Sequence, residues 1–557
     1  MSESTEVRHS DEILIVGGGP TGLILCYELL RRKIPVRIIE KRSGPSHTAR
    51  AFTIHARTME MFDHMSISYR LKEICLECPG NIFNFPGIPP EECPKNDYRG
   101  LPTRYPFYYK ISQNSFEQVL RNHLFAVHGV IAEYSTPLVG LSSPEEAEAD
   151  GGRVTATIQL PDGKMEKVSY PWVIGCDGVR SFVRQAAGID FPGRQINSMA
   201  MMDVHLSNVT FDTEWLHYFF TKNLFMNISR MPGKELYRVY MSEPTGELVN
   251  REDRQQVFQE VADQLGIGFK VGEVEWSTAW EVRNNIATSY RAGRLLICGD
   301  ASHVHSPAGG QGMNGCMQDA FNLGWKLAAV YKGQASPDIL DTYEKERKPI
   351  GEQISAGAAA THKIVMGFGI EPAERLPLTQ VPNWEEQTVS LVSGLAHNYI
   401  KTVTPLLPSM YRDNLLPGPK PGSRAPDVLL TVSPQRHVYD IYRRPQFTLL
   451  VIPDFSPERK SAQIAQAVQV RDAIVKLFPT QVCVFLISDH REEEFGFDNQ
   501  SLDEVGELKG RYGIEKDGQG PGRLVLTRPD LYIALTCELP RWEGILEYLA
   551  GWYFEAK

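Results

Sequence analysis

The sequence predicts an α/β protein in which a Rossmann-type nucleotide-binding domain is interrupted by a β-rich domain and followed by a third, smaller domain. Residues 13–40 carry the first sign: an apolar strand (ILIV), a glycine turn (GGGPTG), a helix and a second strand (VRIIE) form one βαβ unit. Strand-like runs such as WLHYFF, NLFMNIS and LYRVYM then dominate residues 191–285, with one helical segment near 251–265. The apolar strand RLLICGD follows at residues 294–300, so we expect the first domain to be discontinuous.

Changes of pattern along the chain predict the domain boundaries. A stretch rich in Pro, Gly and Cys (CPGNIFNFPGIPPEECP) is expected to be an irregular excursion, after which ISQNSFEQVLRNHLFAV predicts a capped amphipathic helix. A second Pro- and Gly-rich stretch has the composition of a linker, and FTLLVI, VCVFLI and RLVLT predict the strands of a last α/β domain. The predicted segments are 1–190 (first part of the nucleotide domain, with the excursion towards the β-rich domain at 71–110), 191–285 (β-rich substrate domain), 286–401 (second part of the nucleotide domain), 402–427 (linker) and 428–557 (C-terminal domain).

Composition favours a small molecule as the ligand. A formal net charge of -10 and a pI near 5.9 argue against nucleic acid or an anionic membrane as the main partner. The first residues lack the features of a signal peptide and no stretch approaches the ~18 apolar residues of a membrane span, so we expect a soluble, cytoplasmic protein. Nine cysteines are too sparse for a disulfide scaffold, and the C-x-x-C of Cys75 and Cys78 has no second pair to complete a zinc site.

The segment GGGPTG matches the dinucleotide fingerprint G-x-G-x-x-G in its required context between a strand and a helix. Gly17 permits the tight turn, Gly19 lets the backbone approach a pyrophosphate, and Gly22 lets the helix pack closely on the strand. Glu40 ends the second strand, where a carboxylate can accept hydrogen bonds from a ribose diol. The fingerprint predicts a bound dinucleotide and leaves FAD and NAD as alternatives.

Two further motifs decide between them. CDGVRS (residues 176–181) and Gly299-Asp300 each follow a predicted strand, and together with GGGPTG they resemble the three signatures of the class A flavoprotein monooxygenases, the family of para-hydroxybenzoate hydroxylase and phenol hydroxylase. The resemblance implies a glutathione-reductase-like FAD domain, an inserted β-rich substrate domain, and NADH or NADPH as a transient reductant. KPGSRAPD, KGRYGI and LVLTRPDLYIAL resemble the thioredoxin-like C-terminal domain of phenol hydroxylase-type members, which implies support of the core or of a homodimer.

The resemblance also implies roles for individual residues. Glu40 would bind the adenosine ribose of FAD and Asp300 its ribityl or pyrophosphate region. Asp177 lies in the motif associated with both FAD and the visiting NAD(P)H. Gln113 corresponds to the family's flavin-contacting glutamine, and Arg50 lies where a basic residue approaches the cofactor or NAD(P)H; each is alternatively an ordinary surface residue.

The loop PAGGQGMN is expected to bring bare backbone against the flavin ring, with a helix amino end stabilising the negative charge of the reduced ring. The predicted contacts are Pro307, Gly310, Gly312, Met313 and Asn314. His303 and His305 lie two apart, as metal ligands on a strand can, but no carboxylate or Cys completes a set and the family uses such a histidine as a scaffold. We therefore expect no metal.

The reaction that the resemblance implies is the hydroxylation of a phenolic or polycyclic aromatic substrate by a flavin C4a-hydroperoxide formed with oxygen. The segment LYRVY resembles the Arg-aromatic-Tyr strand of phenol hydroxylases, and alternation puts Arg238 and Tyr240 on one face, where one could orient and the other hydrogen-bond a phenolate. Where phenol hydroxylase has an active-site Asp, this sequence has Phe52. The base is then His55 or His217, unless both are structural histidines.

Other outcomes stay open at this point. The same fold and hydroperoxide serve epoxidation, dearomatisation and Baeyer-Villiger ring expansion. A flavin halogenase also shares the fold, but its W-x-W-x-I-P pattern is absent, since Trp276 and Trp280 are four apart. A non-oxygenating flavin-binding protein is the more distant alternative.

Overall fold

The computed structural model describes residues 7–46, 50–412, 416–430, 436–454, 459–489, 497, 499–514 and 520–553. Its internal contacts divide the chain into two units, each described below by itself. The first comprises Met1–Glu60, Ile67–Phe321 and Arg347–Leu395, and the second comprises Met61–Ser66, Asn322–Glu346 and Ala396–Lys557.

A five-stranded sheet forms the centre of the first unit. Its order is β18 (Arg291–Ala292), β19 (Leu295–Ile297), β12 (Val173–Gly175), β2 (Ile13–Val16) and β3 (Val36–Ile39). All neighbours are parallel except the edge strand β18. The helix α1 (Pro20–Leu30) joins β2 to β3, which confirms the predicted βαβ unit. The apolar strands are buried, as expected for parallel strands covered on both faces.

A smaller sheet extends the first unit, in the order β1 (Arg8–His9), β11 (Met165–Tyr170), β10 (Val154–Gln159) and β9 (Leu138–Leu141). The predicted capped helix is α4 (Gln113–His128): the Ser112 side chain accepts the Ser115 N–H, and the helix ends at Gly129 with φ of 69°. The remaining helices of more than four residues that lie at least partly in this unit are α2 (Ala56–His64), α3 (Ser68–Ile74), α5 (Pro144–Ala149), α6 (Phe182–Ala186), α7 (Arg254–Gln264), α8 (Gly312–Tyr331), α9 (Asp341–Val365) and α11 (Trp384–Val392).

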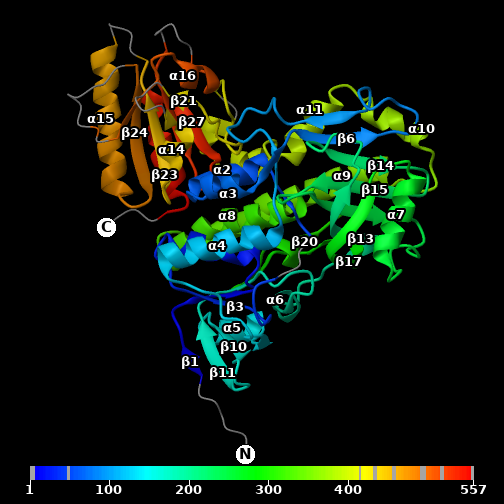
Figure 1. The fold of residues 1–557 in the computed structure, drawn as a ribbon. Helices are drawn as coiled ribbons and strands as arrows, with labels where there is room; N and C mark the ends of the chain where they lie inside the picture. Colours follow the sequence, from blue (N-terminus) through cyan, green and yellow to red (C-terminus); the bar gives the residue numbers. More distant parts are fainter. Residues whose placement is uncertain are drawn as a thin grey trace, which may run out of the picture. The chain divides into compact units, whose positions relative to one another are not determined.

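An eight-stranded sheet contains the strands expected between 191 and 285 (Figure 1). Its order is β20 (His303–Val304), β17 (Lys270–Ile286), β13 (Gly193–Ser207), β16 (Leu236–Ser242), β15 (Phe225–Arg230), β14 (Leu216–Phe220), β6 (Gly80–Asn84) and β7 (Lys95–Asp97). Alternation gives it two apolar faces. One packs on α7 through residues such as Val239 and Met241, and the other carries an aromatic cluster that includes Tyr218 and Tyr240.

The stretch 71–110 does run to the β-rich sheet, but it is not irregular as the sequence suggested. Its β6 pairs in parallel with β14 and extends the eight-stranded sheet, and β7 pairs with β6. Two more of its strands, β5 (Leu76–Cys78) and β8 (Tyr108–Lys110), form a small antiparallel sheet with β4 (Thr53–Ile54). Pro and Gly hid these strands because the pairing that stabilises them is not local: the partner of β6 lies more than 100 positions away, and those of β5 and β8 lie about 30 to 60 positions away.

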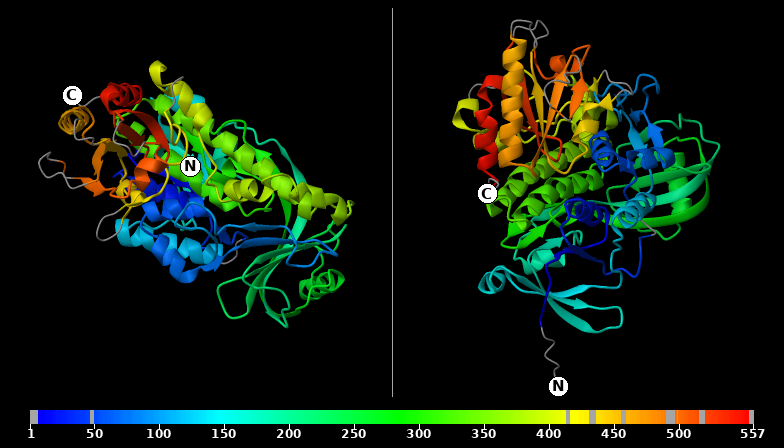
Figure 2. Two further views of the ribbon diagram at one scale, coloured as in Figure 1. Left: turned by 90° about the horizontal axis from the view of Figure 1, so that it is seen from above. Right: turned by 90° about the vertical axis from the view of Figure 1, so that its left-hand side faces the viewer.

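The second unit contains a five-stranded mixed sheet with the order β25 (Gln500–Leu502), β24 (Val482–Ser488), β23 (Phe447–Ile452), β26 (Arg523–Thr527) and β27 (Ile533–Glu538). Strands β23, β24 and β25 are parallel, whereas β26 and β27 are antiparallel to their neighbours. The helix α15 (Lys460–Leu477) contacts β24, and α17 (Glu543–Ala550) contacts β27 (Figure 2). The three predicted strands are confirmed, and the strand order supports the thioredoxin-like class, which stays a prediction.

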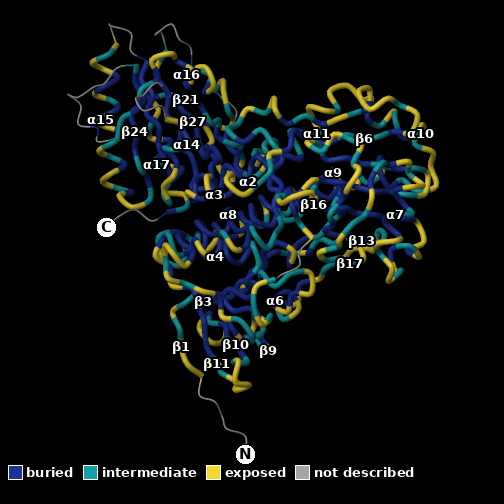
Figure 3. The backbone as a smooth tube through the Cα atoms, viewed as in Figure 1, coloured by how far each residue is buried: buried dark blue, intermediate teal, exposed yellow. Residues whose placement is uncertain are grey.

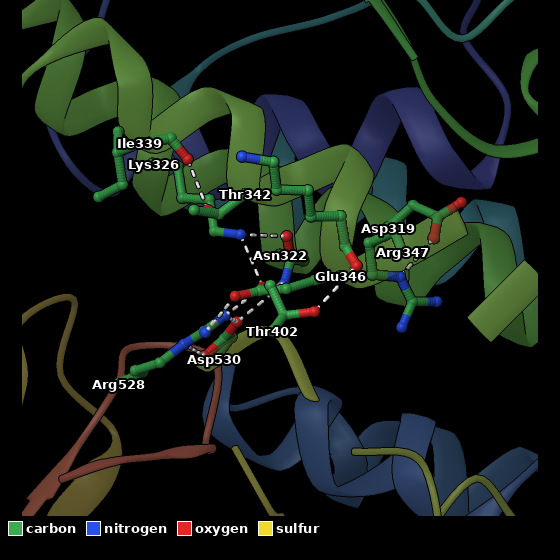
Figure 4. A network of polar contacts seen from close by, with 11 residues as sticks. Asp319, Asn322, Lys326, Ile339, Thr342, Glu346, Arg347, Thr402, Arg528 and Asp530 are labelled. Atoms are coloured by element: carbon green, nitrogen blue, oxygen red, sulfur yellow. Dashed lines mark hydrogen bonds and ion pairs between the residues drawn. The ribbon is translucent and has the colours of Figure 1, made fainter. Parts of the chain in front are cut away.

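The second unit also buries a group of charges, named here the ion network, of Asn322, Lys326, Glu346, Arg528 and Asp530 (Figure 4). The Glu346 carboxylate accepts hydrogen bonds from Arg528 at 2.6 and 2.8 Å, from Lys326 at 2.7 Å and from Asn322 at 2.7 Å. Burial raises the pKa of Glu346, but Arg528 and Lys326 outweigh it and hold that pKa at about 2. Two cations and two carboxylates balance, so the network is electrically neutral.

Figure 3 shows the same pattern of burial in both units, with dark blue strands inside and exposed loops outside. Of the helices that the structure describes, none combines the length and the apolar composition needed to span a bilayer.

Candidate active site

The three sequence motifs meet at the carboxyl ends of adjacent parallel strands. Val16, Gly175 and Ile297 are aligned in register, so the three motifs begin side by side. A Cβ built at Gly17 would lie 2.3 Å from the Cys176 carbonyl oxygen, and one at Gly299 would lie 2.7 Å from the Thr21 hydroxyl. Only glycine permits such contacts, so the motifs form one continuous surface.

Within that surface the fingerprint glycines differ in what surrounds them. A Cβ at Gly22 would lie 2.0 Å from the Gly17 carbonyl oxygen, whereas a Cβ at Gly19 would meet no atom within 4 Å. Gly19 is also the N-cap of α1, and no side chain caps the helix there. The free amide groups at this helix end and the open space at Gly19 together form a cradle for a pyrophosphate.

Glu40 lies beside this cradle and is buried. Its carboxylate accepts the backbone N–H of Gly18 at 2.9 Å, the backbone N–H of Arg42 at 2.9 Å and the Arg42 guanidinium at 3.0 Å. Burial raises the pKa of Glu40, but the bonds from Arg42 and Gly18 outweigh it, so the net shift is downward. A carboxylate has about four acceptor positions, so one remains for a ribose hydroxyl.

Two aspartates follow the other strands. One Asp177 oxygen caps α6 by accepting the N–H groups of Phe182 at 2.6 Å and Val183 at 3.2 Å, while its other oxygen is buried without a hydrogen-bond partner among the described residues. Asp300 is exposed and accepts the Cys316 thiol at 3.2 Å. Both therefore keep acceptor capacity at the edge where a dinucleotide would lie.

The Gly-rich loop after Asp300 has the bare backbone that the sequence predicts. Gly309 and Gly310 have φ of 91° and 65°, and the Gly310 N–H donates to the Pro307 carbonyl at 2.9 Å. Asn314 closes the loop: its amide nitrogen donates to the carbonyls of Thr53 at 2.9 Å and Gly310 at 3.0 Å. Gly312, Met313 and Asn314 begin α8, so the loop ends at a helix amino terminus.

His55 fixes the same loop from the other side. Its Nε2 lies 3.1 Å from both the Gly309 and the Gly310 carbonyl oxygens, so Nε2 carries the proton and Nδ1 is an acceptor. Burial lowers the pKa of His55 to about 4, and the two carbonyls only partly oppose this. A neutral imidazole of this pKa is a hydrogen-bonding group rather than an effective base for a phenol of pKa ~10.

The other histidines have structural partners. The two ring nitrogens of His217 contact the Asp212 carbonyl at 2.7 Å and the Asn84 amide at 3.2 Å. His303 hydrogen-bonds Asp319 at 2.7 Å, which itself accepts Arg347 at 2.6 Å. Within the described ranges, no group of three or more His, Cys, Asp or Glu side chains is arranged to hold a metal ion.

Arg238 and Tyr240 share the face of β16 that the alternation predicts, and both are buried. Arg238 forms two bonds to the Asp203 carboxylate, at 2.7 and 2.6 Å, and also donates to the carbonyls of Arg50 and Ala51. The Tyr240 hydroxyl donates to the Arg50 carbonyl too. The Arg238 guanidinium is thus occupied by protein groups, whereas the Tyr240 oxygen keeps acceptor capacity.

Gln113 and Arg50, for which the sequence left open either a cofactor contact or an ordinary surface position, lie in different parts of the fold. Gln113 is half-buried at the start of α4 and donates to Glu117 at 2.8 Å. The exposed Arg50 side chain lies over the Trp280 ring on β17, with 5.2 Å from its Cζ to the ring centroid. In the described structure the Arg50 guanidinium therefore contacts the eight-stranded sheet.

Comparison with known proteins decides the family. A family model described as an FAD binding domain matches residues 11–358. The chain belongs to this family. Pentachlorophenol 4-monooxygenase of Sphingobium chlorophenolicum is 38% identical, over 96% of this chain and 95% of that protein. A 6-methylpretetramide 4-monooxygenase of Streptomyces rimosus is 34% identical, over 65% of this chain and 63% of that protein.

Solved structures agree on the fold. Aklavinone-11 hydroxylase, in a ternary complex with FAD and aklavinone, has a TM-score of 0.77 and 22% identity, with 98% of this chain and 99% of that chain covered. The protein is an FAD-dependent monooxygenase. The residues present fit FAD, because the open cradle at Gly19, the uncapped amino end of α1 and the carboxylate of Glu40 offer what a pyrophosphate and a ribose need.

One group of this monooxygenase was not singled out from its sequence. Tyr218 lies in the aromatic cluster and hydrogen-bonds the backbone of Gly309. The Tyr108 ring packs at a tilt against His55, with ring centroids 4.9 Å apart, and its hydroxyl shares a 2.8 Å hydrogen bond with the Tyr98 hydroxyl. Strand alternation in WLHYFF predicts that Tyr218 and His217 lie on opposite faces of the sheet. It does not predict the contact between Tyr218 and Gly309, because that contact depends on how the Gly-rich loop folds.

Proposed function

We propose that this FAD-dependent monooxygenase hydroxylates the ring of a phenolic substrate, with NADH or NADPH as the electron donor. The supporting observation is that Ala308, within the Gly-rich loop, belongs to the aromatic cluster of the eight-stranded sheet. The cofactor loop and an aromatic surface thus share one boundary. The named relatives, which include a pentachlorophenol monooxygenase, support a phenolic substrate over epoxidation, ring expansion or halogenation.

When bound, FAD takes electrons from NAD(P)H and supplies activated oxygen. The chain's own residues have three tasks: they exclude water, hold the Gly-rich loop in place and bind the substrate hydroxyl. The aromatic cluster around Phe52, Tyr218 and Tyr240 excludes water from the reacting ring. His55 and Asn314 hold the carbonyls of the loop in place, so that the backbone at Gly309 and Gly310 keeps a fixed position.

We propose that Tyr240 hydrogen-bonds the hydroxyl of the substrate. Burial raises the pKa of Tyr240 to about 12, so the side chain stays protonated at neutral pH. Its proton points to the Arg50 carbonyl and the Arg238 guanidinium hydrogen-bonds its oxygen, which leaves one lone pair to accept a hydrogen bond from a phenol. Arg238 acts as a positioning residue, because Asp203 and the carbonyls of Arg50 and Ala51 occupy its donors.

The test is turnover with a library of electron-rich phenols. NAD(P)H consumption and oxygen uptake should rise with a substrate, and mass spectrometry should find one atom from ¹⁸O₂ in the product. Consumption without any oxygenated product, across the whole library, would remove phenol hydroxylation and leave a non-oxygenating flavoprotein. Steady-state kinetics with NADH and NADPH identifies the reductant.

We also propose the finer organisation: FAD, substrate and thioredoxin-like domains at the predicted boundaries, a homodimer, and a cytoplasmic location. Native mass spectrometry of the full chain tests the dimer, and a single mass equal to one chain would contradict it. Fractionation of cells that express the chain tests the location.

A further inference from the structure

The Arg50 side chain has an unusual combination of contacts. It is exposed and lies over the Trp280 ring of the eight-stranded sheet, with 5.2 Å from its Cζ to the ring centroid. No carboxylate among the described residues pairs with it. A cation–π contact with an indole does not use up the N–H donors of a guanidinium, and those donors match the geometry of a carboxylate or another oxyanion.

The backbone of Arg50 is held in this position. The Tyr240 hydroxyl and the Arg238 guanidinium both donate to the Arg50 carbonyl, the latter at 3.2 Å. Tyr240 in turn packs against Trp280 and Phe52, with ring centroids 6.0 and 5.7 Å away. The cation therefore stands at the edge of a set of aromatic rings rather than on a mobile surface chain.

Neighbouring charges do not cancel it. The Asp203 carboxylate is neutralised by the two bonds from Arg238 and by the Trp276 indole N–H at 2.7 Å. On β17, Glu281 pairs with Arg283 at 2.9 Å. The positive charge of Arg50 also acts on Tyr240, where it opposes the burial that raises the pKa of that hydroxyl.

We propose that Arg50 and Trp280 form a binding subsite for an oxyanion carried by the aromatic substrate. This oxyanion is either a ring carboxylate, with the neutral hydroxyl on Tyr240, or an ionised hydroxyl, which then binds Arg50 in place of Tyr240. The aromatic ring lies against Tyr240, and the anionic group faces the Arg50 guanidinium. This inference rests on the proposed hydroxylation and deepens it, because it selects anionic over neutral aromatic compounds. It also moves Arg50 from the cofactor role expected from its sequence position to a substrate role.

The experiment compares wild type with Arg50→Met and Arg50→Lys on three matched probes. These are a hydroxybenzoate, the corresponding neutral hydroxybenzamide, and a nitrophenol at a pH where it is ionised. Arg283→Met is the matched control, since it removes an exposed arginine on the same strand as Trp280. The readouts are kcat/KM for each probe, KM for NAD(P)H, and binding of the unreactive benzoate by calorimetry to the holoenzyme.

We expect Arg50→Met to lower kcat/KM about 10- to 100-fold for the anionic probes and less than about threefold for the amide, because it removes charge-assisted hydrogen bonds. Arg50→Lys should recover part of the loss. Trp280→Leu should lower kcat/KM more for the anionic probes than for the amide, as Arg50→Met does. A loss restricted to the benzoate assigns the subsite to carboxylates, and one restricted to the nitrophenol assigns it to phenolates.

Two results would overturn the inference. Equal losses for the anionic and neutral probes would make Arg50 a general structural residue. A higher KM for NAD(P)H with unchanged benzoate affinity would return Arg50 to the reductant. If the wild type turns over no phenol, the proposed function fails by itself, while calorimetry with benzoate still decides whether Arg50 binds an oxyanion.

Discussion

Gly19→Ala should weaken FAD binding without disturbing the fold. A Cβ at Gly19 meets no atom within 4 Å, and its φ of -81° and ψ of -176° suit any residue. The substitution should therefore lower the free energy of unfolding of the FAD-free protein by only about 0.5–1 kcal/mol, the difference between glycine and alanine at an N-cap. The methyl group would instead stand where a pyrophosphate must approach the backbone.

Loss of one or two N–H bonds to a charged phosphate, at about 1.5–3 kcal/mol each, should weaken FAD binding at least tenfold. Flavin fluorescence during titration of the FAD-free protein measures this, with thermal unfolding beside it. Gly100→Ala is the control, since its Cβ also meets nothing within 4 Å. Gly22→Ala should fail to fold, with its Cβ 2.0 Å from the Gly17 carbonyl. FAD affinity within threefold of wild type in Gly19→Ala would refute the cradle.

Three further predictions concern buried polar groups. Glu346→Gln should destabilise the protein by about 3–5 kcal/mol in urea unfolding, since it leaves the ion network with an excess buried positive charge, while the exposed Glu352→Gln should have little effect. The pKa of His55 lies near 4 in the folded state instead of 6.5, so the unfolded state binds more protons between these pH values and acid destabilises the fold. The wild type should therefore lose about 3 kcal/mol of stability from this group between pH 6.5 and 4, and His55→Gln should abolish that part of the loss. Tyr240→Phe should cost about 1 kcal/mol of stability, from the lost bond to Arg50, and lower kcat/KM about tenfold; unchanged kinetics would remove Tyr240 from substrate binding.

Local geometry explains what the sequence could predict. The roles of Gly17 and Gly22 follow from a strand, a turn and a helix within ten residues, and the structure shows the close contacts that demand glycine there. The shared face of Arg238 and Tyr240 follows from the two-residue repeat of a strand. Each of the three motifs follows a strand that the sequence predicts to be parallel. Because the carboxyl ends of parallel strands lie at one edge of a sheet, the motifs are predicted to meet there.

Partners that come from distant segments could not be predicted in this way. Arg238 is paired with Asp203, a residue on the neighbouring strand and 35 positions earlier, and periodicity says nothing of that register. Strand β6 depends on β14, more than 100 positions later. The position of Arg50 over Trp280 likewise depends on how β17 packs. The residues around Arg50 in the sequence therefore pointed only to a contact with the cofactor or NAD(P)H.

The ion network limits how this protein could be recombined with its relatives. Arg528 and Asp530 come from the C-terminal part of the chain, whereas Lys326 and Glu346 come from helices α8 and α9. A chimera that exchanged only the C-terminal segment would inherit half of a balanced set of charges. Such grafts should be made with both halves together, and a graft that kept Glu346 but lacked a cation at position 528 should express poorly.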